Sequence, residues 1–291
     1  MNQLVAYGAY PSVLVFGMGF HLFMMHKGWD LQMATYLPII IGAMIVIGLE
    51  FYFPHRQVWK ADKKEILQDT IFMTCIQGVL PKILSFAIAV TLLQNLHTHH
   101  LTMNGWWPTH WPVPFQMLLM MAVADGLRYW LHRMSHEWEP LWRFHAVHHA
   151  PHKLYWLNVG RFHPIDKGLQ FLFDVLPFIL LGVGEEVLGL YLVCYALNGF
   201  FQHSNIEVRL GVLNYVISGP ELHRWHHSRF KEESNHNYGN NLIIWDWLFG
   251  TWYLPEDKHV DELGLVNRRY PTSFLKQMMT PFIAGADKRT V

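Results

Sequence analysis

The chain has 291 residues, of which 52% are hydrophobic and only 15% are charged, against roughly 25% charged residues in an ordinary soluble domain. Basic and acidic residues balance at 22 each, which argues against a nucleic-acid partner because such proteins favour a basic surface. The same composition excludes a disordered chain. With only two cysteines, neither a disulfide framework nor a thiolate metal site is expected. The unusual feature is 20 histidines, because this side chain titrates near neutrality and binds metals.

Four apolar segments in the first half of the chain are each long enough to cross a bilayer as a helix, which takes about 20 residues. They cover residues 7–25, 31–53, 70–93 and 111–131. A soluble core could supply one such segment, but four of them predict an integral membrane protein. We therefore expect an all-α membrane bundle with about four transmembrane helices. No basic region precedes the first segment, so we interpret it as an anchor rather than a cleavable signal peptide.

A last apolar block covers residues 169–202. As one helix it would be roughly 50 Å long, too long for a hydrocarbon layer of about 30 Å. Pro177 and the turn-like stretch 182–186 divide it into two arms. We expect a tilted helical hairpin that enters the membrane and returns to the same side.

The chain contains no repeat and no Pro/Gly/Ser linker, so a single domain over residues 1–291 is expected. Its parts would be a mainly transmembrane region (1–131), a histidine-rich catalytic region with the hairpin (132–255) and a C-terminal tail (256–291).

The positions of lysine and arginine predict how the protein is oriented. The loop after the second segment carries Arg56, Lys60, Lys63 and Lys64 and should face the cytoplasm. The loop over residues 97–114 has no lysine or arginine and suits the opposite interface. The fourth segment then returns to the cytoplasmic side. We therefore expect a multi-pass protein with a cytoplasmic, histidine-rich helical cap.

Three histidine clusters follow the fourth segment, and each has helical spacing. They are His132 and His136, then His145, His148 and His149, then His223, His226 and His227. Positions i, i+3 and i+4 share one face of a helix. Eight imidazoles are too many for one metal ion and suit two metals that share a site. A chance surplus of interfacial histidines is the alternative, but two copies of the same H-x-x-H-H spacing argue against it.

Asp125 is the candidate for a supporting catalytic role, because it lies seven residues before His132 and so on the same helical face. A carboxylate inside an apolar span is costly and is functional by default. We expect Asp125 to accept a hydrogen bond from an imidazole N–H and so fix the tautomer of that ring. Pairing with Arg128 is the alternative.

From about residue 117 to 255 the sequence resembles the fatty acid hydroxylase / sterol desaturase superfamily of integral-membrane non-haem di-iron oxygenases. The resemblance rests on the H-x-x-x-H motif from His132, the two H-x-x-H-H boxes and the closing stretch 237–251. The stretches 129–137 and 219–223 are most similar to alkylglycerol-monooxygenase-like and bacterial sterol-desaturase-like members. This pattern is specific for the superfamily but not for the substrate.

The resemblance implies that the eight box histidines bind iron, and it adds His203, which matches the isolated histidine that the family has ahead of its last box. The implied ligands are His132, His136, His145, His148, His149, His203, His223, His226 and His227. Some members have a further histidine a few residues after this one, but the matching stretch here has none. The identity of a tenth ligand is therefore undecided, with Glu207 or a water as the candidates. His163 and His236 are second choices, with an interfacial or supporting role preferred.

The resemblance also implies two iron ions, O₂ as co-substrate and a lipid substrate such as a sterol, fatty acyl chain, ether lipid or carotenoid. An unactivated C–H bond of that lipid would be hydroxylated or, slightly less favoured, desaturated. No haem- or flavin-binding motif is evident, so an external electron donor is implied: a reductase, ferredoxin, cytochrome or pterin. It would dock on the basic cytoplasmic face near residues 60–64.

Other functions remain open from the residues alone. Imidazole suits iron, zinc and copper alike, so iron rests on the resemblance. A zinc-dependent membrane hydrolase with a metal-activated water is one alternative. A metal transporter is less favoured, because its histidines would line a pathway near the bilayer midplane, whereas these clusters follow a span and lie among arginines.

Overall fold

The computed structural model of the chain describes residues 3–88 and 105–287. Within these residues it consists of helices and turns with three isolated β-bridges and no strand, which confirms the all-α class. The long helices are α1 (Gln3–His26), α2 (Leu31–Tyr52), α6 (Val113–Glu137) and α10 (Glu185–His203). The shorter helices are α3 (Lys63–Phe72), α4 (Leu80–Ile88), α7 (Glu139–His149), α8 (Pro164–Asp174), α9 (Leu176–Leu180), α11 (Pro220–His226), α12 (Lys231–Ser234), α13 (Ile244–Phe249) and α14 (Phe274–Met279).

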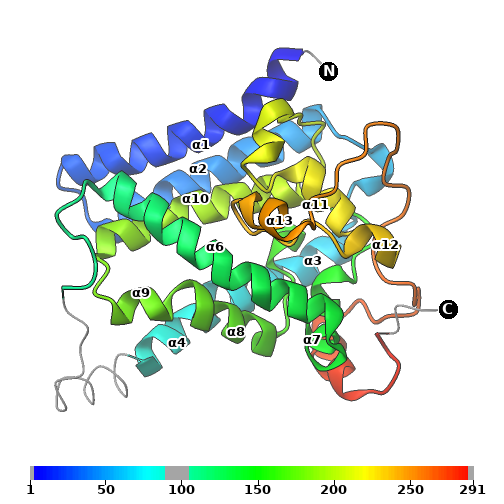
Figure 1. Ribbon diagram of the computed structural model, residues 1–291. Helices are drawn as coiled ribbons and strands as arrows, with labels where there is room; N and C mark the ends of the chain where they lie inside the picture. The colour runs from blue at the N-terminus through cyan, green and yellow to red at the C-terminus, as the bar shows by residue number, and fades with distance from the viewer. Residues whose placement is uncertain (1–2, 89–104, 288–291) are drawn as a thin grey trace.

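Helices α1, α2 and α10 pack side by side, and α6 crosses in front of them (Figure 1). Close approach is possible because Gly17 of α1 and Gly42 of α2 both face Leu197 of α10. A β-carbon on Gly17 would come within 2.3 Å of the Leu197 side chain, and one on Gly42 within 2.2 Å. Leu197 is fully buried in the apolar core that the three helices share. Most of α10 is buried in this way, so the second arm of the expected hairpin is a central helix of the bundle.

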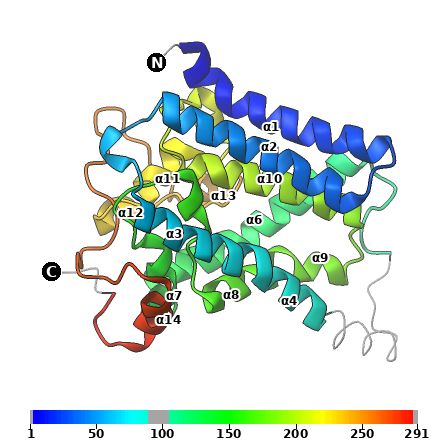
Figure 2. The same cartoon turned by 180° about the vertical axis from the view of Figure 1, so that it is seen from behind.

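Among the described residues, three helices are long and apolar enough to cross a membrane: α1, α2 and the continuous helix Lys63–Ala87. The third combines α3, a π-helical segment (Met73–Val79) and α4, and it lies on the far side of the bundle (Figure 2). It begins before the expected residue 70 because Asp62 and Glu65 form a capping box at its N-terminus. The expected end of this span, at residues 89–93, lies outside the described residues.

The fourth expected span corresponds to α6, which is not among these three candidates. The expected helix is present and continuous, and it does carry His132 and His136 near its end. Its inner face buries Asp125, Arg128 and both histidines, so this helix is less apolar than a simple span. The residues of the expected hairpin form the end of α8 and α9 as one arm and α10 as the other; that this segment enters the membrane stays a prediction.

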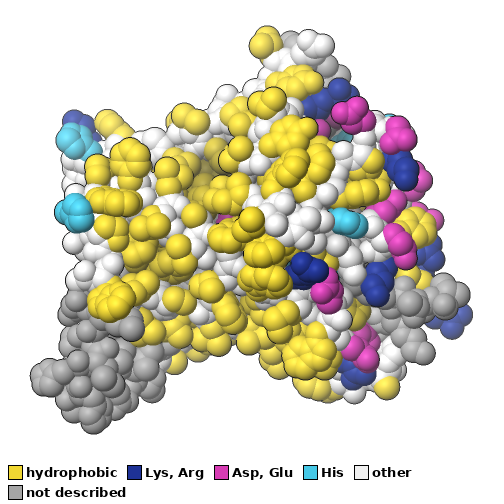
Figure 3. Space-filling model, in the orientation of Figure 1, with side chains coloured by type: hydrophobic (Ala, Val, Ile, Leu, Met, Phe, Trp, Pro, Cys, Tyr) yellow, Lys and Arg dark blue, Asp and Glu magenta, His cyan; other side chains and the backbone are white. Residues whose placement is uncertain are grey.

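Most charged side chains gather at the end of the molecule where α7, α11 and α12 lie, and hydrophobic side chains predominate across the middle of the visible face (Figure 3). The loop after α2 lies at the same end. There Arg56 Nη1 donates to the Asp261 carbonyl at 3.1 Å, and Lys153 pairs with Glu65 at 2.8 Å. The basic loop and the histidine-rich region are therefore on one side of the apolar band.

Candidate metal centre

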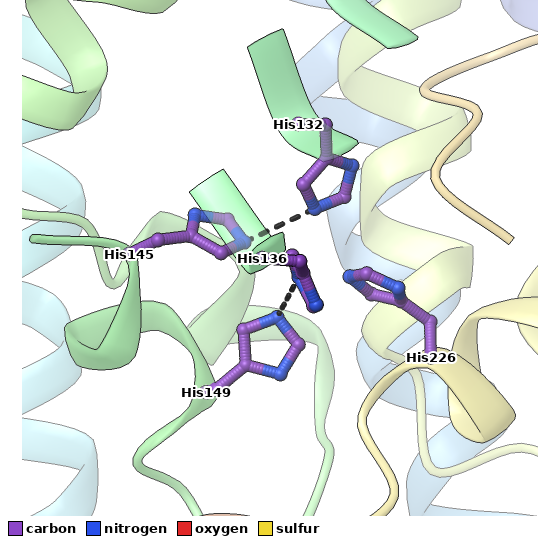
Figure 4. Close-up of side chains that lie close together, drawn as sticks. All are labelled: His132, His136, His145, His149 and His226. Atoms are coloured by element: carbon purple, nitrogen blue, oxygen red, sulfur yellow. Dashed lines mark hydrogen bonds between the residues drawn. The ribbon is translucent and has the colours of Figure 1, made fainter. Parts of the chain in front are cut away.

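The first group of histidines brings five rings together from three helices. Their nitrogen atoms lie within 4.8 Å of one another, and Figure 4 shows the rings converging. The Nε2 atoms of His132 and His145 are 3.0 Å apart, and those of His136 and His149 are 3.1 Å apart. The group comprises His132 and His136 of α6, His145 and His149 of α7, and His226 of α11.

The second group has four rings, again with nitrogen atoms within 4.8 Å of one another. Its members are His148 of α7, His203 at the end of α10, His223 of α11 and His227 just after that helix. The two groups adjoin, because the rings of His149 and His227 stack with centroids 4.3 Å apart. All nine histidines named from the sequence thus lie in two neighbouring groups, five in one and four in the other.

Each H-x-x-H-H box contributes to both groups, which differs from the expectation that its three rings share one face. In α7, His145 and His149 join the first group and His148 the second. In the last box, His223 and His227 join the second group and His226 the first. The reason is the 3.6-residue turn: residues i and i+4 stay together, while residue i+3 lies about 100° away from its neighbour i+4.

Short local elements hold the boxes in place. A single residue, Trp138, separates α6 from α7, so the two histidine-bearing helices fold sharply against each other. Pro140 lies in the first turn of α7 and Pro220 opens α11, positions where the missing proline N–H leaves no helical bond unmade.

Most rings are anchored through Nδ1, which leaves Nε2 to face the group. Hydrogen bonds join Nδ1 of His132 to the Tyr238 carbonyl at 2.7 Å and Nδ1 of His148 to the Arg161 carbonyl at 3.2 Å. His226 bonds to the His236 carbonyl at 2.9 Å and His203 to Asn158 Oδ1 at 2.8 Å. A ring that donates from Nδ1 presents an unprotonated Nε2, the form that binds a metal.

Asp166 of α8 is the carboxylate that contacts an imidazole. Its Oδ2 accepts from His145 Nδ1 at 2.9 Å, and its Oδ1 accepts from Gln170 Nε2 at 3.1 Å. Burial raises the pKa of this carboxyl, but His145, Arg128 and Gln170 together outweigh that effect and hold the pKa below its usual range. The sequence does not predict this role of Asp166, because the spacing from His145 does not indicate that α8 folds back against α7.

The prediction that Asp125 accepts a hydrogen bond from an imidazole was wrong. Asp125 accepts from the Asn241 backbone N–H and side-chain amide, each at 3.0 Å, and from the Leu242 N–H at 2.5 Å. None of these donors is an imidazole. The alternative partner, Arg128, lies beside Asp174. The reason is that the closing stretch folds over α6 and places its backbone donors against this carboxylate.

The remaining candidates lie away from both groups. Glu207 pairs with Arg209 at 3.3 Å on the surface, so it does not supply a tenth ligand to the second group. His163 caps α8 by accepting from the Ile165 N–H at 3.1 Å. His236 contributes its carbonyl, not its ring, by accepting from His226.

Imidazole binds a metal in its neutral form, and at least four of the nine rings have a pKa that favours this form. Burial, followed by the neighbouring imidazoles, lowers the pKa of His148, His149, His223 and His227 well below the usual value of 6.5. In the second group, three buried ring nitrogen atoms have no hydrogen-bond partner among the described residues: His203 Nε2, His223 Nδ1 and His227 Nδ1.

This donor set fits metal ions. Two ligands about 2.1 Å from one ion and at a right angle lie roughly 3.0 Å apart, which matches the 3.0 Å that separates Nε2 of His132 from that of His145 and the same distance between Nε2 of His223 and His227. Each group could hold one ion.

The closing stretch forms a tight loop beside the first group. Asp246 accepts from the Tyr238 N–H at 2.8 Å, the Gly239 N–H at 2.7 Å and Thr251 Oγ1 at 2.7 Å. This fixes the Tyr238 carbonyl that bonds His132. Asp246 and Asp125 therefore secure the loop from both ends.

Comparisons with known proteins agree with this geometry. A family profile described as fatty acid hydroxylase matches residues 117–251, the part of the chain that carries both groups. The chain is 32% identical over 288 residues to the ornithine lipid hydroxylase OlsE of Rhizobium tropici, an alignment that covers 97% of this chain and 85% of that protein.

Two further relatives match only the histidine-rich half. Alkylglycerol monooxygenase of Xenopus tropicalis is 31% identical over 52% of this chain and 33% of its own length. Delta(7)-sterol-C5(6)-desaturase of Nicotiana tabacum is 27% identical over 52% of this chain and 54% of its own length. No solved structure matches the chain.

Proposed function

Because this chain belongs to the fatty acid hydroxylase family, whose members are oxidoreductases that act on lipids, we propose that it is an O₂-dependent di-iron membrane oxygenase. It would hydroxylate an unactivated C–H bond of a lipid. The observation that carries this proposal is the pair of adjoining buried histidine groups, which offer two neutral nitrogen donor sets. The relatives named above act on lipids by hydroxylation, monooxygenation or desaturation, which favours oxidative over hydrolytic chemistry.

His132, His136, His145, His149 and His226 would hold one iron, and His148, His203, His223 and His227 the other. When bound, the iron pair supplies activation of O₂ and abstraction of hydrogen from carbon. Asp166 holds the His145 ring in one tautomer, and the Tyr238 carbonyl does the same for His132. Met117, Met120 and Ala124 of α6 pack with Leu190 and Cys194 of α10 into an apolar core next to this region, which excludes water from the reaction.

An ornithine-containing membrane lipid is the first substrate to test. The ornithine lipid hydroxylase is similar over nearly the whole chain, including α1 and α2, whereas the alkylglycerol and sterol enzymes match about half of it. Because that relative is named a hydroxylase, we favour hydroxylation over desaturation.

We further propose that the histidine-rich end faces the cytoplasm, since the basic loop over residues 56–64 lies at that end and positive loops stay inside. The external electron donor would approach there. A surface pocket at this end is lined by Trp142, His149 and Arg229, so it brings a donor close to the first group.

The test is metal analysis and O₂ uptake on the protein purified in lipid nanodiscs. We expect two irons per chain, lipid-dependent O₂ consumption with a reductant, and a product 16 mass units heavier than the substrate. His132→Asn should abolish this, whereas His259→Asn, which changes an exposed histidine outside both groups, should not. Tight zinc with hydrolytic release of an acyl chain would instead support the hydrolase, and metal flux in proteoliposomes the transporter.

A further inference from the structure

A second buried polar cluster lies beside the metal centre, between α6, α8 and α10. Its central residues are Arg128 of α6, Asp174 of α8 and Tyr191 of α10, which are only 5%, 5% and 4% exposed. Arg128 Nη1 is 3.8 Å from Asp174 Oδ2, too far for a hydrogen bond. The two charged side chains are therefore neighbours, but these two atoms do not form a hydrogen bond.

Within the part of the chain that the structure describes, several atoms of this cluster have no hydrogen-bond partner: Arg128 Nε and Nη1, Asp174 Oδ1 and the Tyr191 hydroxyl. The surrounding polar groups are already engaged. Asp125 uses both oxygens on the closing stretch, and Lys167 donates to Gln170 and Tyr195 at 3.3 and 3.0 Å. Buried ion pairs are sustained by good geometry and added hydrogen bonds. The Arg128–Asp174 pair has a long separation and keeps two donors and one acceptor without partners among the described residues. These unpartnered atoms are available to a ligand.

The cluster is close to both the metal centre and the lipid-facing surface. Arg128 is one helical turn before His132, a rise of about 6 Å, and it lies within electrostatic range of Asp166. Asp174 ends α8, where the neighbouring Leu172 and Phe173 are exposed apolar side chains. A lipid could thus present its polar group to the cluster while it lies beside the histidines.

Resting on the function proposed above, we propose that Arg128, Asp174 and Tyr191 form the recognition site for a zwitterionic lipid headgroup, in which an acid lies close to a primary ammonium. The acid pairs with the Arg128 guanidinium, whose planar fork matches a carboxylate or phosphate. The ammonium pairs with Asp174, and the Tyr191 hydroxyl adds a third hydrogen bond.

Both charges of the ligand are needed for this match. A headgroup with an acid alone would meet Asp174 as a like charge 3.8 Å from the guanidinium. A neutral lipid such as a sterol or diacylglycerol would leave both ions unpaired. Sites built with buried polar groups reject ligands that lack the complementary ones, so the cluster selects by charge pattern.

The test measures lipid binding to the iron-loaded protein under anaerobic conditions, by native mass spectrometry in nanodiscs. The probes are an N-acyl-ornithine lipid, its carboxyl methyl ester, its δ-N-acetyl derivative and phosphatidylethanolamine. We expect the wild-type protein to bind the unmodified ornithine lipid at least tenfold more tightly than either blocked form. Phosphatidylethanolamine shows whether a phosphate serves as the acid. Equal affinity for the unmodified lipid and its methyl ester would overturn the proposal.

Two variants assign the charges to residues. Arg128→Gln should remove the preference for the free acid but keep that for the free amine, and Asp174→Asn should do the reverse. Arg133→Gln, which removes a charge from the same helix outside the cluster, should keep both preferences. If a cluster variant does not fold, the four lipids on the wild-type protein still decide the question.

Binding and oxidation are measured separately, so the two proposals can fail independently. Charge selection without lipid oxidation, with iron and reductant present, would refute the oxygenase and leave the headgroup site standing. Lipid oxidation without charge selection would refute the headgroup site alone.

Discussion

Asp166→Ala tests whether Asp166 supports metal binding by the first histidine group. In the wild type, one oxygen of Asp166 accepts from His145 Nδ1 at 2.9 Å and the other from Gln170 Nε2 at 3.1 Å. Without the carboxylate, the His145 ring is free to rotate and to exchange tautomers. Asp166→Asn is a finer change, because Asn offers only one acceptor oxygen. If that oxygen accepts from His145, the Asn side-chain NH₂ group faces the Gln170 NH₂ group, and two donors then oppose each other.

The expected loss follows from the charge-assisted bond. A carboxylate behind a metal-bound histidine contributes about 10–100-fold in metal affinity, which is roughly 1.4–2.7 kcal/mol. Asp166 is buried, so water does not replace the lost acceptor, and Asp166→Ala should lie near the upper value. Asp166→Asn should lie near the lower value, because it keeps one neutral hydrogen bond.

The assay is competition for the metal against a chelator of known affinity, with Co²⁺ absorption as a second readout of ligand geometry. Glu137→Gln is the matched control: it lies next to His136 but pairs with Arg133 at 3.0 Å on the surface, so it should leave the affinity unchanged. If Asp166→Ala is folded and binds metal as tightly as the wild type, with an unchanged Co²⁺ spectrum, the positioning role is refuted.

Three further predictions concern stoichiometry, packing and pH. His223→Asn should lower the iron content from two per chain toward one, because it removes a donor from the second group alone; elemental analysis that still finds two irons would contradict this. Leu197→Ala should lower the free energy of unfolding by about 2–5 kcal/mol, since the void faces Gly17 and Gly42; denaturant unfolding in detergent measures it, and Leu192→Ala on the exposed side of α10 should change little. Because burial lowers the pKa of His148, His149, His223 and His227, the unfolded chain binds more protons than the folded one below about pH 6.5. Metal-free protein should therefore lose stability as the pH falls from 6.5, by up to about 1.4 kcal/mol per pH unit for each ring, and a flat thermal profile between pH 7.5 and 5 would contradict the burial argument.

Features with a period of a few residues could be predicted from the sequence. The apolar runs predicted α2 to within one residue and α1 except for its first four residues. The i, i+4 spacing of His132 and His136 predicted that both lie at the end of α6. The surplus of imidazoles in the boxes predicted two metals; the structure brings these imidazoles into two groups, and the number of metals stays a prediction. These signals are local, because helix geometry alone decides which neighbours in the chain share a face.

Features that depend on the path of the chain could not be predicted. The helical spacing between Asp125 and His132 predicted an imidazole partner for Asp125. The spacing does not show that the closing stretch folds over α6, where the Asn241 and Leu242 N–H groups donate to this carboxylate. For the same reason, the sequence does not predict that Asp166 contacts His145 or that Arg128 and Asp174 are neighbours. The division of each box between two groups was missed for a different reason: the spacing was interpreted as one face, whereas the 100° step between adjacent residues points them into two sites.

That division explains why the two groups share helices. Because α7 contributes His145 and His149 to one group and His148 to the other, and α11 is divided in the same way, a movement of either helix changes both donor sets together. The fixed points of these helices are Asp166 behind His145, the Arg161 carbonyl behind His148 and the His236 carbonyl behind His226. A short segment of backbone thus sets the distance between the two sites, which independent loops would leave variable. The spacing of the two histidine groups is in this sense a property of the α-helix itself.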